Sequence, residues 1–100
     1  MKIEKIYLSA EDEDFPTNPI GCTDVIVFLN NGAKYFSTFF SFDEVDKIRE
    51  IGKQTGEFLN GSYFRAEQMI LAENCSRSLI QKVIEHLMEE GEFGQAFKRL

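Results

Sequence analysis

The fold of this chain is decided by residues 24–45, which read DVIVFLNNGAKYFSTFFSFDEV. An apolar run ends at Asn30-Asn31-Gly32, and a second strand-like run follows it. Asn-Gly between two hydrophobic runs is a strong signal for a β-hairpin, because its central residues accept positive φ at little cost. Residues 23–30 and 33–40 are therefore predicted to pair as antiparallel strands.

A helix start follows the hairpin directly. Ser41 and Glu44 have the spacing of a capping box, in which each side chain satisfies a backbone N–H group at the helix N-terminus. The predicted helix runs from Phe42 to about Thr55, and Gly52 or Gly56 ends it.

The remaining segments complete the pattern. Residues 2–8 are predicted to form a strand whose imperfect alternation indicates a bulge, and residues 10–20 a loop. Asn60-Gly61, between short apolar pairs, suggests a second, shorter hairpin. Residues 67–73 contain residue types that favour a helix, but a short apolar run before a strong helix start favours a buried strand, and we predict a strand.

The clearest helix signal lies near the C-terminus. Apolar residues recur at helical spacing between a Ser76 N-cap and the stop at Gly91. Phe93, Phe97 and Leu100 are then predicted to share one face of a short terminal helix. These elements describe a single α+β domain over residues 1–100. Its mainly antiparallel sheet of four or five strands, in the order β-β-β-α-β-α, is packed by two main helices and the short terminal one.

The hairpin register depends on the turn. A two-residue turn at Asn31-Gly32 pairs residues whose numbers sum to 63, whereas a three-residue turn with a bulge at Gly32 reshuffles the two faces. Both faces are apolar in either case, and one layer of helices covers only one of them. The other face needs the rest of the chain or a partner, so we expect association, most simply as a two-fold dimer.

The composition of the chain narrows the range of partners and locations that we expect for it. Seventeen acidic against eleven basic residues give a net charge of −6, which repels phosphate and argues against a nucleic-acid partner. The charge suits a basic protein partner, and it equally suits plain solubility. Because no apolar run reaches membrane-spanning length and the N-terminus does not read as a signal peptide, we expect a cytoplasmic protein without membrane contact.

No residues assemble into a recognisable catalytic or metal site. Cys75 precedes a predicted helix N-terminus near Arg77, but His86 lies roughly 16 Å along the same helix at 1.5 Å per residue, too far for a dyad. We therefore interpret Cys75 as a packed thiol and His86 as a half-exposed helix residue. The sequence lacks nucleotide-binding, hydrolase and metalloprotease motifs, so we predict no enzyme activity, no metal and no cofactor.

Two acidic groups are candidates for binding a partner. Glu89, Glu90 and Glu92 cluster at a helix C-terminus, where the helix dipole prefers cations, and Glu85 lies one turn earlier. The second group is the loop at Glu11, Asp12, Glu13 and Asp14, which lacks the glycine and spacing of a calcium loop. The alternative for both groups is a solvated surface.

The chain also resembles a set of proteins through Asn31-Gly32-Ala33-Lys34-Tyr35, Thr38-Phe39-Phe40, Thr55-Gly56-Glu57, Leu59-Asn60-Gly61, Tyr63-Phe64 and Met69-Ile70. These are short, mostly uncharacterised bacterial proteins, some found beside toxin genes as candidate immunity proteins. The resemblance implies a non-catalytic protein-interaction module, an inhibitor of a basic toxin, and brings no site residues with it. The alternative is a small-molecule-binding or enzymatic domain with a Phe-lined pocket.

Overall fold

The predicted hairpin forms the centre of the sheet in the computed structural model, which describes residues 2–11 and 21–100. Its strands are β2 (Cys22–Leu29) and β3 (Lys34–Ser41). The Leu29 N–H donates to the Ala33 carbonyl oxygen (2.9 Å), and Gly32 has φ +89°. The loop therefore has three residues with a left-handed glycine at its end. Paired residues sum to 62, as in Val27 with Tyr35, so the register of a two-residue turn is wrong and the three-residue alternative is confirmed.

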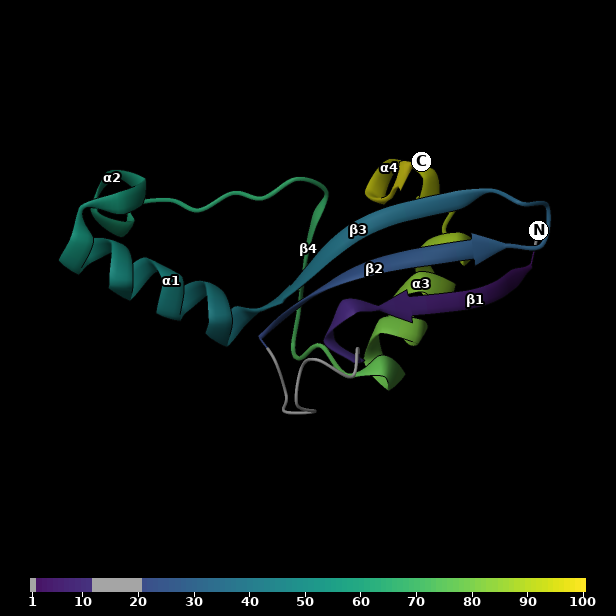
Figure 1. Ribbon diagram of the computed structural model, residues 1–100, viewed down its shortest axis with the longest axis horizontal. Coiled ribbons are helices and arrows are strands. Elements are labelled where there is room, and N and C mark those ends of the chain that lie inside the picture. The colour runs from purple at the N-terminus through teal and green to yellow at the C-terminus, as the bar shows by residue number, and fades with distance from the viewer. Residues whose placement is uncertain (1, 12–20) are drawn as a thin grey trace.

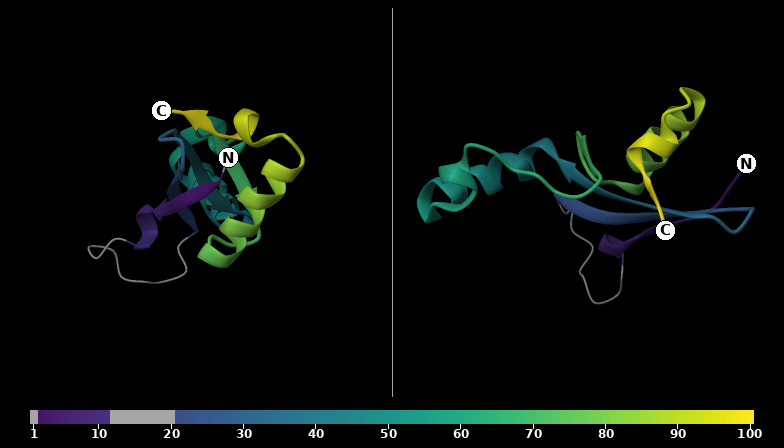
Figure 2. Two further views of the ribbon diagram at one scale, coloured as in Figure 1. Left: turned by 90° about the vertical axis from the view of Figure 1, so that its right-hand side faces the viewer. Right: turned by 90° about the horizontal axis from the view of Figure 1, so that it is seen from above.

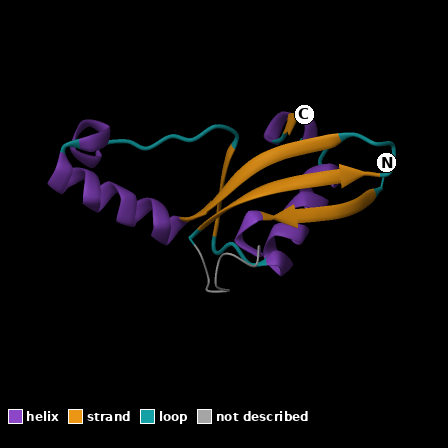
Figure 3. Ribbon diagram, viewed as in Figure 1, coloured by secondary structure: helices purple, strands orange, loops and turns teal. Residues whose placement is uncertain are grey.

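Three further strands complete the sheet (Figure 3). Strand β1 (Ile3–Leu8) pairs antiparallel with β2 and contains the predicted bulge between Ile3 and Lys5. Strand β4 (Met69–Ala72) lies parallel to β3, and β5 (Lys98–Arg99) lies antiparallel to it. The strand predicted over residues 67–73 is confirmed, as is the α+β class with a mainly antiparallel sheet.

Helix α1 (Phe42–Thr55) begins and ends where predicted. The Ser41 hydroxyl accepts from the Glu44 N–H (3.0 Å), and Gly56 ends the helix with φ +87°. The capping box is only half formed, because the Ser41 N–H donates to the Gly21 carbonyl oxygen instead of the Glu44 side chain. Ahead of the hairpin, a 3₁₀ turn, η1 (Ser9–Glu11), follows β1.

The core lies between one face of the sheet and the helices α3 (Arg77–Glu89) and α4 (Phe93–Ala96). Figures 1 and 2 show both helices on the same side of the sheet. Helix α3 inserts Ile80 and Ile84, which are fully buried, against Val25, Val27 and Phe39 of the hairpin. This apolar layer anchors the sheet and fixes how α3 lies beside β1.

The opposite sheet face, called here the open face, carries Tyr7, Ile26, Phe28, Lys34 and Phe36. Among the described residues, no helix lies over it (Figures 1 and 2). The Nζ atoms of Lys5 and Lys34 lie 5.9 and 5.6 Å from the Phe28 ring centroid, one from each neighbouring strand. The expectation that one layer of helices leaves one face of the hairpin without helix cover holds.

Two local predictions are wrong. The segment at Asn60-Gly61 is not a hairpin but a short helix, α2 (Glu57–Gly61), whose backbone turns left-handed. The terminal helix stops at Ala96, Phe97 is extended, and β5 follows. Phe97 is buried and Leu100 is exposed, so these two residues do not share a helix face.

Helices α1 and α2 protrude beyond the end of the sheet (Figure 1), and the Cα atoms extend over 46 × 29 × 22 Å. No helix within the described residues is long and apolar enough to cross a membrane.

Candidate functional site

A groove of about 690 Å³ runs between the edge strand β1 and helix α3. Residues 2–6 line one side of it, and Arg77, Gln81, Glu85 and Met88 line the other. Among the described strands, β1 pairs only with β2, so its second edge faces this groove. The groove therefore combines backbone groups of a free strand edge with apolar and charged side chains.

The helical side of the groove follows from the sequence of α3. The Ser76 hydroxyl accepts from the Leu79 N–H (3.2 Å), which sets the phase of the helix. Ile80 and Ile84 of this helix lie in the core. Arg77, Gln81 and Glu85, which follow one another at i, i+4 spacing, therefore lie on the side of α3 that faces β1. Glu89 is the next residue on this ridge and is exposed.

Arg77 joins three elements at one end of the groove. Its Nη2 donates to Glu11 Oε1 (2.6 Å) and to the Ile6 carbonyl oxygen (2.9 Å), while its Nε contacts both Glu11 oxygens (3.0 and 3.1 Å). The hydrogen bond from Arg77 lowers the pKa of Glu11, and the same bond raises the pKa of Arg77. A bidentate fork of this kind holds η1 and β1 against α3.

This ion pair separates Glu11 from the other candidate residues. Glu11 is bound to the first turn of α3, roughly 12 Å from the level of Glu85 at 1.5 Å per residue. Its carboxylate already has a cation, so it adds little negative charge to the surface. Asp12, Glu13 and Asp14 lie outside the described residues.

The remaining candidates gather toward the C-terminal end of α3. Glu85, Glu89, Glu90 and Glu92 are all exposed, and Glu85 also lines the groove. Within the part of the chain that the structure describes, none of the four forms an ion pair, whereas Glu11, Glu50 and Glu67 each have one. We call these four residues the acidic ridge. Helical periodicity in the sequence located the ridge but gave no sign of the groove beside it.

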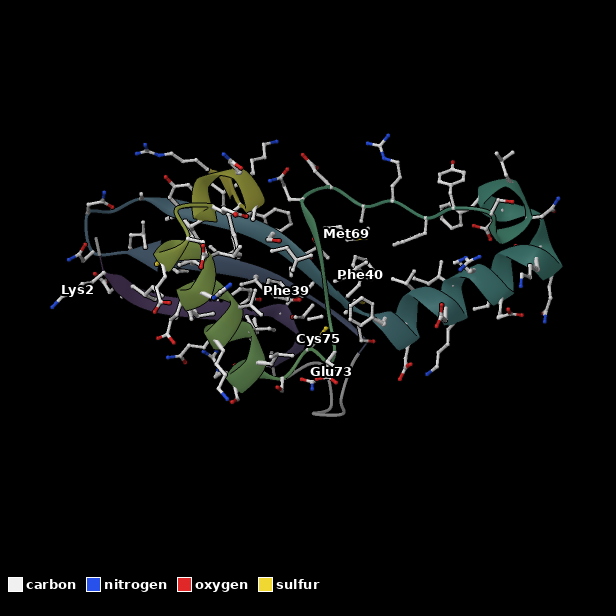
Figure 4. All side chains as sticks on the ribbon, turned by 180° about the vertical axis from the view of Figure 1, so that it is seen from behind. Lys2, Phe39, Phe40, Met69, Glu73 and Cys75 are labelled. Carbon is white, nitrogen blue, oxygen red and sulfur yellow. The ribbon has the colours of Figure 1, made fainter. Side chains whose placement is uncertain are left out.

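Cys75 is a packed thiol in the structure. Its Sγ lies 3.5 Å from the Gly21 carbonyl oxygen and 3.6 Å from that of Phe39, near the end of β4 (Figure 4). Burial, and to a smaller extent Cys22 and Glu44, raises the pKa of the Cys75 thiol to about 11. A thiol with this pKa is protonated at neutral pH, so it is a poor nucleophile. His86 is exposed on α3.

A smaller pocket bears on the small-molecule alternative. It has a volume of about 340 Å³ and lies under the end of α3, where Tyr35 meets Phe93 edge-on at 5.0 Å. Phe93 is the one phenylalanine in its lining, and no carboxylate, imidazole, ammonium or thiol group of the described residues lines it. Across residues 2–11 and 21–100, no cluster of His, Cys, Asp and Glu could hold a metal ion.

Comparison of the chain with protein-family models, with curated proteins and with solved structures finds no match.

The Arg77–Glu11 pair leads to a prediction about pH. Because the folded-state pKa of Glu11 lies below its ordinary value of 4.5, the pair stabilises the fold above that value and loses its effect as pH falls through the lowered pKa. Glu11→Gln should therefore lower the free energy of unfolding at neutral pH by at most about 1 kcal/mol, since the pair is partly exposed. The difference from the wild type should close on acidification.

Urea unfolding over a range of pH measures this difference. Glu92→Gln is the matched control, because Glu92 is exposed and forms no ion pair with any described residue. A difference for Glu11→Gln that stays constant down to acid pH would show that the ion pair contributes nothing.

Proposed function

We propose that this protein is a non-catalytic protein-binding module of the immunity type, which inhibits a basic toxin by covering part of its surface. The observation that carries the proposal is the acidic ridge, four exposed carboxylates without ion-pair partners among the described residues. Elsewhere in the described chain, Glu11, Glu50 and Glu67 are balanced by a neighbouring cation. The ridge therefore differs from other exposed carboxylates without an ion pair, such as Glu57 and Glu73, in gathering four of them at one end of α3, while Lys2 and Lys5 line the groove beside Glu85.

The position of the acidic ridge strengthens the negative electrostatic potential around it. Glu89 and Glu90 lie at the C-terminal end of α3, where the helix dipole already contributes partial negative charge, and Glu92 follows as the N-cap residue of α4. Such a cluster costs some stability in the isolated protein, and a basic partner offsets that cost. Complementary charge of this kind steers encounter and raises the association rate more than it raises the affinity.

The groove supplies contacts that charge alone does not. Ile3 and Met88 are half-buried in it, next to the free edge of β1 and to Glu85. A partner segment lying along this edge would meet backbone groups of β1, apolar side chains and the first carboxylate of the ridge together. Apolar contacts of this type, sheltered by a polar rim, provide most of the affinity in protein interfaces.

The test is affinity capture from the native cell with three baits. The first is the wild type, and the second is Glu85→Lys combined with Glu89→Lys. The third is Glu57→Lys combined with Glu73→Lys, which changes the net charge equally at exposed residues outside the ridge. We expect the wild type and the third bait to retain the same basic protein and the second bait to lose it.

Association rates measured with the captured protein then distinguish electrostatic steering from direct contact in the complex. The wild type should associate faster at low salt and slow down as the Debye length shrinks to about 8 Å near physiological ionic strength. The ridge variant should associate slowly at all salt concentrations, with a melting temperature equal to or slightly above that of the wild type, because cations are favoured at a helix C-terminus. Equal binding by all three baits would mean that the ridge is only a solvated surface.

A further inference from the structure

The smaller pocket, with a volume of about 340 Å³, lies where the chain turns from α3 into α4 (Figure 2). Gly91 follows α3 with φ +73°, and α4 begins two residues later. One side of the pocket is fixed by the core, because Phe93 is buried and its ring lies 5.0 Å from that of Tyr35 and 4.6 Å from that of Phe97. The full lining is Leu29, Tyr35, Met88, Gly91, Phe93 and Gly94.

Gly94 is a glycine that the fold does not require. The described glycines with positive φ are Gly32, Gly56, Gly61 and Gly91, so Gly94 does not use the conformational freedom of glycine. A Cβ added at Gly94 would meet no atom within 4 Å, so packing does not exclude a side chain there. Gly94 also lies within α4, where glycine is less favourable than alanine.

The consequence of a glycine at this position is an open pocket. Glycine is the usual residue where a ligand approaches the backbone closely, and Gly94 exposes its backbone in the pocket lining. A side chain at residue 94 would have space only where a bound group now has it. The glycine therefore costs the isolated helix stability and leaves room for an occupant.

The chemistry of the pocket selects an apolar group. No charged side chain of the described residues lines it, and Tyr35 carries the one hydroxyl group among its lining side chains. Its volume lies at the lower end of the range for ligand pockets, which fits one large side chain. Met88 has a flexible thioether side chain that adapts to the shape of an occupant.

The chain segment around the pocket is acidic. Three residues of the acidic ridge alternate in sequence with lining residues: Glu89 and Glu90 lie between Met88 and Gly91, and Glu92 lies between Gly91 and Phe93. All three are exposed. Of the cations on neighbouring elements, Arg99 pairs with Tyr35 between β5 and β3, and Lys2 lines the groove with Met88, but neither lines the pocket. The surroundings therefore favour a basic group next to the apolar one.

We propose that this pocket receives a large apolar side chain of the partner, and that lysine or arginine residues beside that side chain contact Glu89, Glu90 and Glu92. The inference rests on the proposed function for the existence of a basic protein partner, and it adds the kind of segment that the partner inserts. A side chain carried by a protein brings basic neighbours to these carboxylates, whereas a free apolar molecule gains nothing from them. Met88 lines both the pocket and the groove, so one partner segment can occupy both.

Synthetic peptides test the chemistry of the pocket directly. The probe is Gly-Lys-Phe-Lys-Gly with acetylated and amidated ends, titrated into the ¹⁵N-labelled protein. It should shift the amide signals of Gly91, Gly94 and Tyr35. A peptide with alanine in place of the phenylalanine should bind about tenfold more weakly or worse, since a buried large side chain contributes at least that much. A peptide with glutamate in place of both lysines should not bind.

Each control peptide can overturn part of the proposal. Equal binding by the alanine peptide would mean that the pocket takes no side chain. Equal binding by the glutamate peptide would mean that the carboxylates do not select a basic segment. Shifts confined to residues outside the pocket lining would place the peptide elsewhere on the protein.

Two variants at one position provide a matched pair. Gly94→Ala adds only a methyl group and should leave peptide affinity nearly unchanged, with a melting temperature equal to or above that of the wild type. Gly94→Leu adds a branched side chain in the pocket lining and should weaken the peptide by about tenfold, the loss expected when the phenylalanine is shut out. Circular dichroism checks that both variants fold. Wild-type affinity in Gly94→Leu would overturn the proposal.

The basic protein captured by the wild type separates this inference from the proposed function. Gly94→Leu should raise its dissociation rate by about tenfold and leave its association rate unchanged, because an anchor acts on the complex after encounter. If Gly94→Leu binds that protein as the wild type does, while Glu85→Lys with Glu89→Lys still loses it, the pocket is not the anchor and the proposed function stands. If no basic protein is captured, the proposed function fails, and the peptide titration decides whether the pocket takes a basic segment with an apolar side chain.

Discussion

Phe97→Ala is expected to lower the free energy of unfolding by about 3–5 kcal/mol, the usual cost of removing a large aromatic side chain from a core. Phe97 is 1% exposed, its ring stacks on Phe93 at 4.6 Å, and it lies 6.3 Å from the Phe39 ring. The extended backbone at residue 97 places this side chain between α4 and the sheet. Its loss would leave a cavity that the surrounding strands cannot close.

Chemical denaturation measures this effect, and Leu100→Ala is its control. Leu100 is three residues away and 63% exposed, so its truncation should change the free energy of unfolding by no more than about 0.5 kcal/mol. Equal effects at the two positions would mean that the chain end forms the continuous helix expected from the sequence, with both residues on one face.

Gly61→Ala is expected to unfold α1 and α2, which form the arm that extends beyond the sheet with α2 at its tip, while the sheet stays folded. Gly61 has φ +77°, and a Cβ there would collide with the Arg49 carbonyl oxygen, which belongs to the backbone of α1 and cannot move aside alone. Positive φ and collision together should cost several kcal/mol, more than the local stability of a helix with so little core behind it. Hydrogen exchange should show loss of protection in α1 and retained protection in β2 and α3.

Gly91→Ala separates conformational strain from collision. Gly91 also has positive φ, +73°, but no atom lies within 4 Å of the place that an alanine Cβ would occupy there. Only the cost of about 1 kcal/mol for a left-handed alanine then applies. Protection of α1 should be unchanged in this variant. If Gly61→Ala behaved like Gly91→Ala, the contact between the tip and α1 would not be what holds the arm together.

Elements that depend on local signals were predictable from the sequence. Residues 22–41 form a hairpin because an Asn-Gly turn separates two apolar runs, and α1 and α3 begin at Ser41 and Ser76 because their hydroxyls cap N–H groups three residues later. The strand at Met69–Ala72 followed from its short apolar run. The turn length remained open, because two-residue and three-residue loops share the same Asn-Gly signal.

Features that depend on distant contacts were not predictable. The strand β5 is two residues long and exists because Tyr35 and Phe36 offer a stretch of β3 that β4 does not reach. The left-handed turn at residues 58–60 carries side chains that disfavour it, and its contact with α1 through two glycines stabilises it. Neither β5 nor this turn can be predicted from the local propensities of its residues.

The candidate site also has features that were predictable from the sequence and features that were not. Exposure of Glu85 and Glu89 follows from their phase relative to the buried Ile80 and Ile84. The ion pair between Arg77 and Glu11 joins residues 66 apart in the sequence, and no local pattern signals it. The groove was equally hidden, because it exists only once β1 has packed beside α3.

The parallel pairing of β3 with β4 also sets the order in which the molecule can assemble. The hairpin closes over three residues and can form within microseconds, but β4 must return across the whole arm before it can pair with Thr38–Ser41. Loop-closure entropy grows only slowly with loop length. Unfolding of the segment between β3 and β4 should therefore slow the pairing of these two strands only slightly. We therefore expect the folding rate to be insensitive to mutations at the arm tip, and their destabilising effect to appear as faster local opening.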